Sequence, residues 1–384
     1  MKILVVGINT RPVVNSAKKL GYNVYSVSYY NPIDLNADVK EYIIDDNYHG
    51  FFNKNYDEKK LIDYANKYAH DVDHIFIGSG VFESEDSKIM DWEAVVGNPP
   101  KKIKSLSNKY HTLRKLENIG CPVPITHIAH NYHQLEKYLH EFNTLIVKPL
   151  YGHGGSGVHT ISLNTTNDIL FNLLKNLKYP ILVQEFINSN SFSAAYINGE
   201  FIAFNRQIIM NNAYIGNITP YKINKDVNNI ENTINLFNDV IDYFKLEGMN
   251  GIDFMVKDGH PMVIEINPRI LGTFETLEMS SNKNLVRYMI ENKNNNYHNN
   301  YNNHQNNYNN YNNKILLKTQ YIKKILFAKE RLISNIKKKS NIFDIPKYGA
   351  IIEKGEPLTT IIGKNTQEIR KITHDISKMV ILWR

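Results

Sequence analysis

A lysine followed by a glycine-rich loop is the clearest sign of chemistry in this sequence. Lys148 ends the apolar run Leu145–Val147. The loop after it carries four glycines and a serine, Gly152, Gly154, Gly155, Ser156 and Gly157. Glycines let successive backbone N–H groups converge on phosphate oxygens, and the lysine supplies a positive charge. The loop lacks the GKS or GKT ending of a Walker A motif, so on its own a flexible hairpin beside a surface lysine stays open.

Two carboxylates, an amide and an arginine form a second group, about 100 residues later. Asp253 lies in one predicted strand of a hairpin, and Glu265, Asn267 and Arg269 alternate along the other. Residues two apart in an extended chain point the same way, so we expect all four on one face. Such oxygens suit Mg²⁺, and an arginine can bind a transferring phosphoryl group. A structural salt-bridge cluster is the alternative, and without Cys or His a zinc site is disfavoured.

The first 105 residues alternate short apolar runs with helical patterns, and the runs are Ile3–Val6, Val24–Val27, Tyr42–Ile44 and His74–Ile77. This alternation predicts a Rossmann-like α/β domain over residues 1–105, with a parallel sheet. Ligands bind such sheets beyond the carboxyl ends of the strands. Ser79, Gly80 and Glu83 are therefore candidates for substrate contact, although tight turns, or a helix N-cap at Ser79, would explain the same residues.

The middle of the chain has a different texture from residue 106 onward. A helix carrying Lys109 is expected to end at Gly120, followed by several strand-like runs and by an amphipathic helix over Ile230–Phe244. These patterns predict an α+β domain over residues 106–290.

The last quarter of the chain begins with a polar tract. Residues 292–313 are only Asn, Tyr, His, Gln and Lys, which predicts a disordered insertion over 291–313. Apolar residues spaced by three or four then predict a helix over Lys314–Lys339. Short strands near Ala350–Ile352 and Leu358–Ile362 complete a C-terminal unit, 314–384, with a helix and a small β-structure.

The charge of the chain is concentrated in one place. Lys and Arg number 45 against 38 Asp and Glu, a net charge of +7. Nine basic residues and one Glu fall within 314–340, so the remainder carries about −1. A nucleic-acid partner is therefore not expected. The lone Cys121, the missing signal peptide and the missing 18-residue apolar run favour the cytoplasm and argue against a membrane span.

Taken together, the motifs resemble those of the ATP-grasp superfamily of ATP-dependent ligases, over residues 1 to about 290. The order is Lys148 with its glycine loop, then Val183-Gln-Glu-Phe-Ile187, then Asp253, then Glu265-Ile-Asn-Pro-Arg269. Ser191–Tyr196 and the tail are similar to a carboligase-like branch related to biotin carboxylase. The Gln-Val-Glu-His run that follows Asn-Pro-Arg in biotin carboxylases is absent here, which disfavours bicarbonate chemistry on biotin.

The resemblance implies a role for each matching residue, with ATP and Mg²⁺ as cofactors and Mn²⁺ as a substitute. Lys109 and Lys148 would contact the ATP phosphates, and Gly152–Gly157 would close over them. Glu185, Phe186 and Ile187 would form the hinge that holds adenine. Asp253, Glu265 and Asn267 would hold the metal, and Arg269 would stabilise the phosphoryl transition state. Many relatives place an acidic residue soon after the hinge to hold the ribose; here Ser191 is the candidate, and that contact stays open.

The activity that the resemblance implies is ligation of a small carboxylate to an amine or a thiol through an acyl phosphate, in small-molecule or cofactor biosynthesis. The alternatives are a carboxylase-like enzyme and an ATP-binding regulatory protein without turnover. A homodimer is left open. Arg206 and Gln207 could reach the acceptor, although Arg206 could equally be a surface ion pair. Cys121 has no evident His partner, so a nucleophilic role is not expected.

Overall fold

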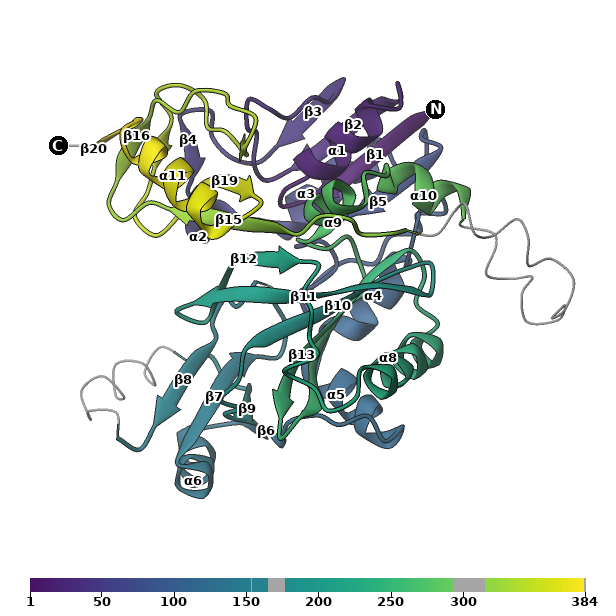
Figure 1. Cartoon of the computed structure of the whole chain (residues 1–384), viewed down its shortest axis with the longest axis vertical. Helices are drawn as coiled ribbons and strands as arrows, with labels where there is room; N and C mark the ends of the chain where they lie inside the picture. Colours follow the sequence, from purple (N-terminus) through teal and green to yellow (C-terminus); the bar gives the residue numbers. More distant parts are fainter. Residues whose placement is uncertain (153, 165–176, 293–314, 383–384) are drawn as a thin grey trace, which may run out of the picture.

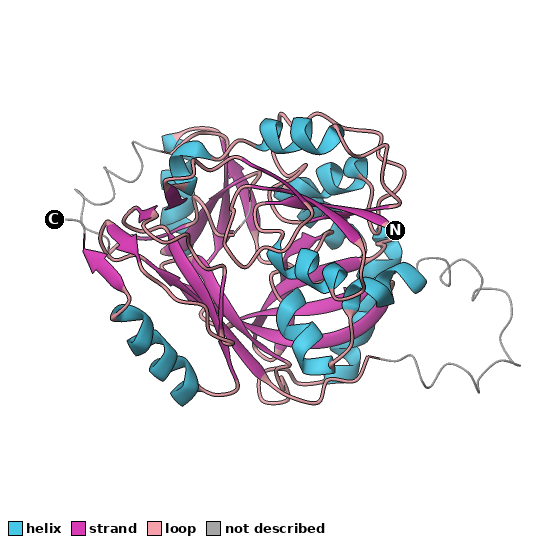
Figure 2. Ribbon diagram, turned by 90° about the horizontal axis from the view of Figure 1, so that it is seen from above, coloured by secondary structure: helices cyan, strands magenta, loops and turns pink. Residues whose placement is uncertain are grey.

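The computed structural model of the chain describes residues 1–152, 154–164, 177–292 and 315–382. Four β-sheets organise these residues, and the N- and C-terminal parts of the chain lie together, purple beside yellow in Figure 1. In the perpendicular view the strands cross the middle of the molecule and helices lie at the periphery (Figure 2). No helix in the described ranges is both long and apolar enough to cross a membrane. The predicted disordered insertion falls almost wholly on residues outside those ranges.

The N-terminal region contains a parallel sheet, as its apolar runs predict. Its strand order is β3-β2-β1-β5, with every pair parallel. The elements of this region are β1 (Lys2–Gly7), α1 (Arg11–Lys18), β2 (Asn23–Ser28), β3 (Val39–Tyr42), β4 (Tyr48–Gly50), α2 (Phe52–Asn55), α3 (Glu58–Asn66), β5 (His74–Ile77) and α4 (Pro100–Ser107). One face of the sheet packs with α3 and α4, and the other packs with α1. The strand order changes direction between β1 and its neighbour β5. The loops that follow these two strands therefore lie together at one edge of the sheet.

The middle region supplies two antiparallel sheets. The smaller has the order β6-β9-β7-β8, and the larger begins β14-β13-β10-β11-β12. The elements are α5 (Lys109–Asn118), β6 (Thr126–Ala129), α6 (Tyr132–Phe142), β7 (Thr144–Pro149), β8 (His159–Ser162), β9 (Ile181–Glu185), β10 (Ser191–Ile197), β11 (Glu200–Met210), β12 (Ala213–Thr219), α8 (Ile230–Phe244), β13 (Met249–Lys257), β14 (His260–Asn267), α9 (Phe274–Ser281) and α10 (Leu285–Glu291). α8 has the predicted bounds and packs its buried face, including Phe237 and Ile241, on the larger sheet.

The C-terminal region does not stand apart from that larger sheet. Three of its strands continue it in the order β12-β15-β19-β17, giving eight strands in all. A four-stranded sheet, β20-β16-β18-β4, joins this region to the N-terminal one. The elements are β15 (Tyr321–Phe327), β16 (Leu332–Ser334), β17 (Ile342–Phe343), β18 (Ile351–Ile352), β19 (Pro357–Gly363), α11 (Thr366–Ser377) and β20 (Val380–Leu382).

The predicted helix over Lys314–Lys339 is wrong, because that segment holds β15 and β16. Its apolar spacing fits a helix, but pairing of β15 with β12 and β19 buries more of the chain and overrides the local pattern. Lys323, one of the basic residues of this segment, is only 6% exposed. Its ammonium donates to the carbonyl of Gly272 and lies 3.8 Å from the carboxylate of Glu275.

A buried network of charges joins the three regions around Arg11. The Arg11 guanidinium donates through Nη1 and Nη2 to both oxygens of Glu275, at 2.7 and 2.8 Å, and through Nε to Asp344 at 2.6 Å. Asp34 lies 3.4 Å from the same Nε, and the Phe343 ring lies against the guanidinium. Burial opposes the charge of Asp344, but Arg11 outweighs it and lowers the pKa of Asp344 well below its ordinary value. We refer to Arg11, Asp34, Glu275 and Asp344 as the Arg11 network.

Candidate active site

The β13–β14 hairpin places two carboxylates opposite each other. Asp253 pairs with Glu265 across the strands, and the hairpin turns at Asp258 and Gly259, both with positive φ. Asn267 lies two residues beyond Glu265 and donates through Nδ2 to the Asp253 carboxylate at 3.0 Å. The hairpin therefore brings these three predicted metal ligands together on one face, as the alternation of the strands indicates.

Two lysines from other elements reach the same place. Lys109, the first residue of α5, donates to Glu265 Oε1 at 2.7 Å and to the carbonyl of Gly152 at 2.6 Å. Lys148, near the end of β7, donates to the amide oxygen of Gln184 on β9 at 3.0 Å. Gln184 in turn donates to Thr126 on β6, which fixes the direction of its amide. Gln184 is a positioning residue that the sequence analysis did not predict. The signal that could have found it is a polar side chain at the end of the buried apolar run Ile181–Val183 of β9.

The charges of this cluster are incompletely balanced. Burial, together with Glu265, raises the pKa of Asp253 to about 7. Burial lowers the pKa of Lys148 to about 8, with Glu265 opposing and Lys109 adding to that shift. Both groups are thus pushed toward their neutral forms, because the site removes water without supplying full partners. Perturbed acids and bases gathered in one place are typical of functional sites.

The glycine loop is built so that only glycine fits at its critical position. Positive φ angles occur at all four glycines of the loop, Gly152, Gly154, Gly155 and Gly157. The side chain of Ser156 is exposed. A Cβ on Gly155 would lie 2.2 Å from the carbonyl oxygen of Asn212, at the β11–β12 turn. The loop therefore packs closely against that turn, and Lys109 links its first glycine to the carboxylates.

Arg269 lies at the end of β14 beside the carboxylate pair. Its Nε forms a salt bridge with Glu83 of the N-terminal region, and its Nη2 donates to Asn267 Oδ1 at 3.1 Å. Burial opposes its charge, but Glu83, followed by Glu265 and Asp253, raises the pKa of Arg269. Arg269 therefore stays positively charged next to two acidic groups.

The carboxylate pair of this cluster fits a divalent cation. Asp253 and Glu265 provide oxygen ligands, and Glu265 contributes to the raised pKa of Asp253, a repulsion that a cation would relieve. Asn267 fits less directly, because its oxygen accepts from Arg269 and its nitrogen faces Asp253. The residues therefore fit Mg²⁺ with the two carboxylates as ligands, and Asn267 would have to turn its amide to join them.

The predicted adenine hinge follows β9. The Glu185 carboxylate accepts from the Ile125 N–H at 3.0 Å and from Lys257 at 2.6 Å, so it is occupied within the protein. Phe186 is 43% exposed and Ile187 is buried. The outward ring of Phe186 is an apolar surface that a planar base could cover.

Ser191, Gln207 and Arg206 separate onto two faces of the larger sheet. Ser191 donates to Gln207 at 2.6 Å, and Gln207 hydrogen-bonds Asp253, so this pair adjoins the carboxylates. Arg206 instead donates to Asn190 and lies over the Tyr221 ring on the other side. Neighbours on a strand face opposite ways, so Gln207 is near the candidate site and Arg206 is not.

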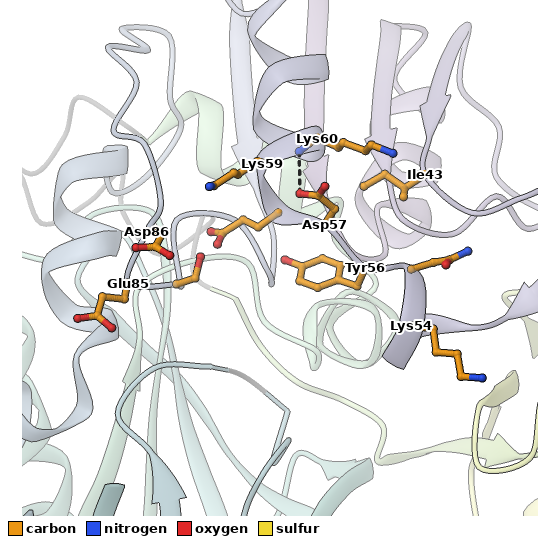
Figure 3. A pocket seen from close by; sticks show the side chains of 11 residues that line it. Ile43, Lys54, Tyr56, Asp57, Lys59, Lys60, Glu85 and Asp86 are labelled. Atoms are coloured by element: carbon orange, nitrogen blue, oxygen red, sulfur yellow. Dashed lines mark hydrogen bonds between the residues drawn. The ribbon is translucent and has the colours of Figure 1, made fainter. Parts of the chain in front are cut away.

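A hollow of about 770 Å³ lies beside the Glu83 loop. Figure 3 shows Tyr56, Asp57 and Lys59 on one side of it, and Glu85 and Asp86 on the other. Tyr56 donates to the carbonyl of Gly80, which ties this wall to the loop after β5. No helix begins directly after Ser79, so Ser79 is not an N-cap, and its carbonyl accepts from the Ile8 N–H.

Cys121 is buried, and burial raises the pKa of its thiol to about 12. A thiol that stays protonated at neutral pH is a poor nucleophile. Its packing in the core around α5 and α8 is the observed role.

Comparison with known proteins identifies the type of domain that carries these residues. Residues 106–273 match a family model described as an ATP-grasp domain. An uncharacterised protein of Methanocaldococcus jannaschii is 50% identical over 98% of this chain and 91% of its own. Tyramine–L-glutamate ligase of the same organism is 33% identical over 30% of this chain and 36% of its own.

The fold is shared with proteins of much lower identity. The biotin carboxylase domain of 2-oxoglutarate carboxylase from Hydrogenobacter thermophilus, solved as a dimer with MgADP, ADP and bicarbonate, is similar with a TM-score of 0.68. The match has 15% identity and covers 100% of this chain and 90% of that one. The expected mixed fold is confirmed, and a carboligase-like branch is consistent with it. The chain therefore carries an ATP-grasp domain, as the motifs of its sequence indicate.

Proposed function

We propose that this protein is an ATP- and Mg²⁺-dependent ligase that joins a small carboxylate to an amine through an acyl phosphate. The single observation that carries the proposal is the convergence of Lys109, Lys148, Asp253, Glu265 and Arg269 from four separate elements. Such a set of two lysines, two carboxylates and an arginine matches what phosphoryl transfer requires, namely positioning and neutralisation of charge.

Each residue of the cluster would have its own role in binding ATP and Mg²⁺. Lys148 and Lys109 would bind the phosphates of ATP, beneath the loop of Gly152–Gly157. Asp253 and Glu265, with Asn267 after rotation of its amide, would hold Mg²⁺, which neutralises charge on the phosphates. Arg269 would bind the oxygens of the phosphoryl group in flight. Glu185, Phe186 and Ile187 would border the adenine. The ribose contact stays open, since Ser191 is engaged with Gln207.

The chemical steps balance without a nucleophilic side chain. A carboxylate oxygen of the substrate attacks the γ-phosphorus, the bond to the ADP oxygen breaks, and an acyl phosphate forms. The amine then attacks the acyl carbon, the C–O bond to phosphate breaks, and an amide, phosphate and a proton are released. The relative that supports an amine acceptor is tyramine–L-glutamate ligase, whose name gives an amine and an amino acid as its substrates.

The test measures release of ADP and phosphate across a panel of carboxylic acids and amines. Pairs that form an amide should raise turnover in the wild type and not in Lys148→Ala or Glu265→Ala. Hydroxylamine added with the carboxylate alone should yield a hydroxamate. If ATP stabilises the protein against heat but no pair raises turnover and no hydroxamate forms, the protein binds ATP without ligating, and the proposal is wrong.

A further inference from the structure

Arg269 is held on three sides within the protein. Besides Glu83 and Asn267, its Nη1 donates to the carbonyl of Ile270 at 3.3 Å. A guanidinium has five N–H groups, and these contacts use three. One N–H on each terminal nitrogen is left without an acceptor in the described part of the chain. Two such donors form a fork that suits a pair of oxygens on one phosphoryl group.

The partner at Nε comes from a different region of the protein. Glu83 lies in the loop after β5, 186 residues before Arg269. The two side chains are 10% and 8% exposed, so the salt bridge is shielded from water. Glu83 uses one carboxylate oxygen for Arg269, and its other oxygen accepts from the Gly80 N–H at 2.6 Å.

The loop that carries Glu83 is itself fixed. Glu58, at the start of α3, accepts from the Glu83 N–H at 2.8 Å and from the Ser87 hydroxyl at 2.9 Å. Gly80 has a φ of +81°, and a Cβ there would lie 2.7 Å from the Tyr56 hydroxyl. The carboxylate of Glu83 is thus anchored at its backbone and at both oxygens, as a group that orients another group must be.

We infer that Glu83 is a positioning residue for phosphoryl transfer, which orients the free edge of Arg269 toward the carboxylate pair without touching the substrate. This inference rests on the proposed function, because it takes Arg269 as the group that binds the phosphoryl in flight. An ion pair that only joins two regions is the competing explanation. Buried pairs contribute little net stability, so geometry is the better reason for this one.

The decisive variant is Glu83→Gln. A glutamine side chain has only one acceptor oxygen, so it can accept from Arg269 or from the Gly80 N–H, but not from both. Its NH₂ group would then face the remaining donor. The probe is MgADP with and without aluminium fluoride, which mimics the phosphoryl group in flight and needs no knowledge of the substrates. In the wild type, aluminium fluoride should tighten MgADP binding, and we refer to this increase in affinity as the gain. Glu83→Gln should reduce the gain by about 10- to 100-fold and leave the affinity for MgADP alone unchanged.

Two comparisons make the result specific. Glu278→Gln is the matched control, because Glu278 also links α9 to the N-terminal region, through Ser16 and Lys19, and should keep the full gain. Arg269→Ala should abolish the gain.

The outcomes separate the two proposals. A gain that survives in Arg269→Ala overturns the role of Arg269, and this inference with it. A loss in Arg269→Ala with a normal gain in Glu83→Gln overturns the inference alone. Should Glu83→Gln fail to fold, Glu83→Asp keeps both oxygens but is one methylene shorter, and a normal gain in that variant also overturns it.

Discussion

Two clusters of buried charge differ in how completely their members are paired. In the Arg11 network the guanidinium has carboxylates at Nε and at both terminal nitrogens. Lys148, by contrast, donates to one amide and forms no ion pair within the described ranges, and its pKa falls to about 8. The comparison teaches that the charges of the Arg11 network balance one another within the fold, whereas the imperfectly paired charges mark where a charged ligand would complete the pairing.

The largest effect is expected from breaking the Arg11 network. Arg11→Met leaves three carboxylates without their common partner in the interior. The free energy of unfolding, measured with urea, should fall by about 3–5 kcal/mol. Lys19→Met, which removes the exposed lysine that pairs with Glu278, should change the free energy of unfolding by less than about 1 kcal/mol. Equal effects of the two variants would show that the network is not a stabilising contact.

Lys148→Met should differ from Arg11→Met in that it lowers turnover without lowering the stability of the fold. Turnover should fall by about 10²- to 10³-fold, because a charge aimed at the phosphates is lost. The free energy of unfolding should stay the same or rise, because the variant no longer buries a poorly paired ammonium. Lys137→Met removes an exposed lysine from α6, which packs on the same small sheet, and should leave both quantities unchanged. A large loss of stability in Lys148→Met would contradict the comparison.

The pH dependence of stability should expose Asp253. Its native pKa is about 7 against an ordinary 3.8, so the native protein holds this proton more tightly than the unfolded chain. Stability therefore falls as pH rises from about 4 to 7. Asp253→Asn should be as stable as the wild type near pH 4 and about 4 kcal/mol more stable at pH 8, in EDTA. Asp242→Asn, on the exposed side of α8, is the control, and the idea fails if the two variants behave alike.

The smallest effect concerns Lys109, which already contacts the Glu265 carboxylate. A cation binding at Glu265 must displace this ammonium. Lys109→Gln should therefore bind Mn²⁺ alone about tenfold more tightly, by calorimetry, while binding MgATP more weakly. Lys115→Gln, an exposed change on the same helix, should alter neither affinity. Weaker Mn²⁺ binding in Lys109→Gln would mean that Lys109 supports the metal rather than competing with it.

Local patterns were sufficient to predict part of the fold and of the candidate site. Alternation along two strands predicted that Asp253, Glu265 and Asn267 share a face, and amphipathic spacing predicted α8. The contact of Glu83 with Arg269 spans 186 residues and that of Arg11 with Asp344 spans 333, and no local pattern encodes either. The wrongly predicted helix over Lys314–Lys339 has the same cause, since pairing with β12 outweighs the spacing of apolar residues.

The pairing of β15 with β12 has a consequence for the newly made chain. Between the end of β12 at Thr219 and the start of β15 at Tyr321 lie about 100 residues, so β12 is synthesised long before its neighbour. Until then its outer edge offers unpaired N–H and C=O groups to any passing strand. Truncation before residue 321 should leave that edge open permanently, and such a fragment should self-associate even though its predicted ATP-binding residues are all present.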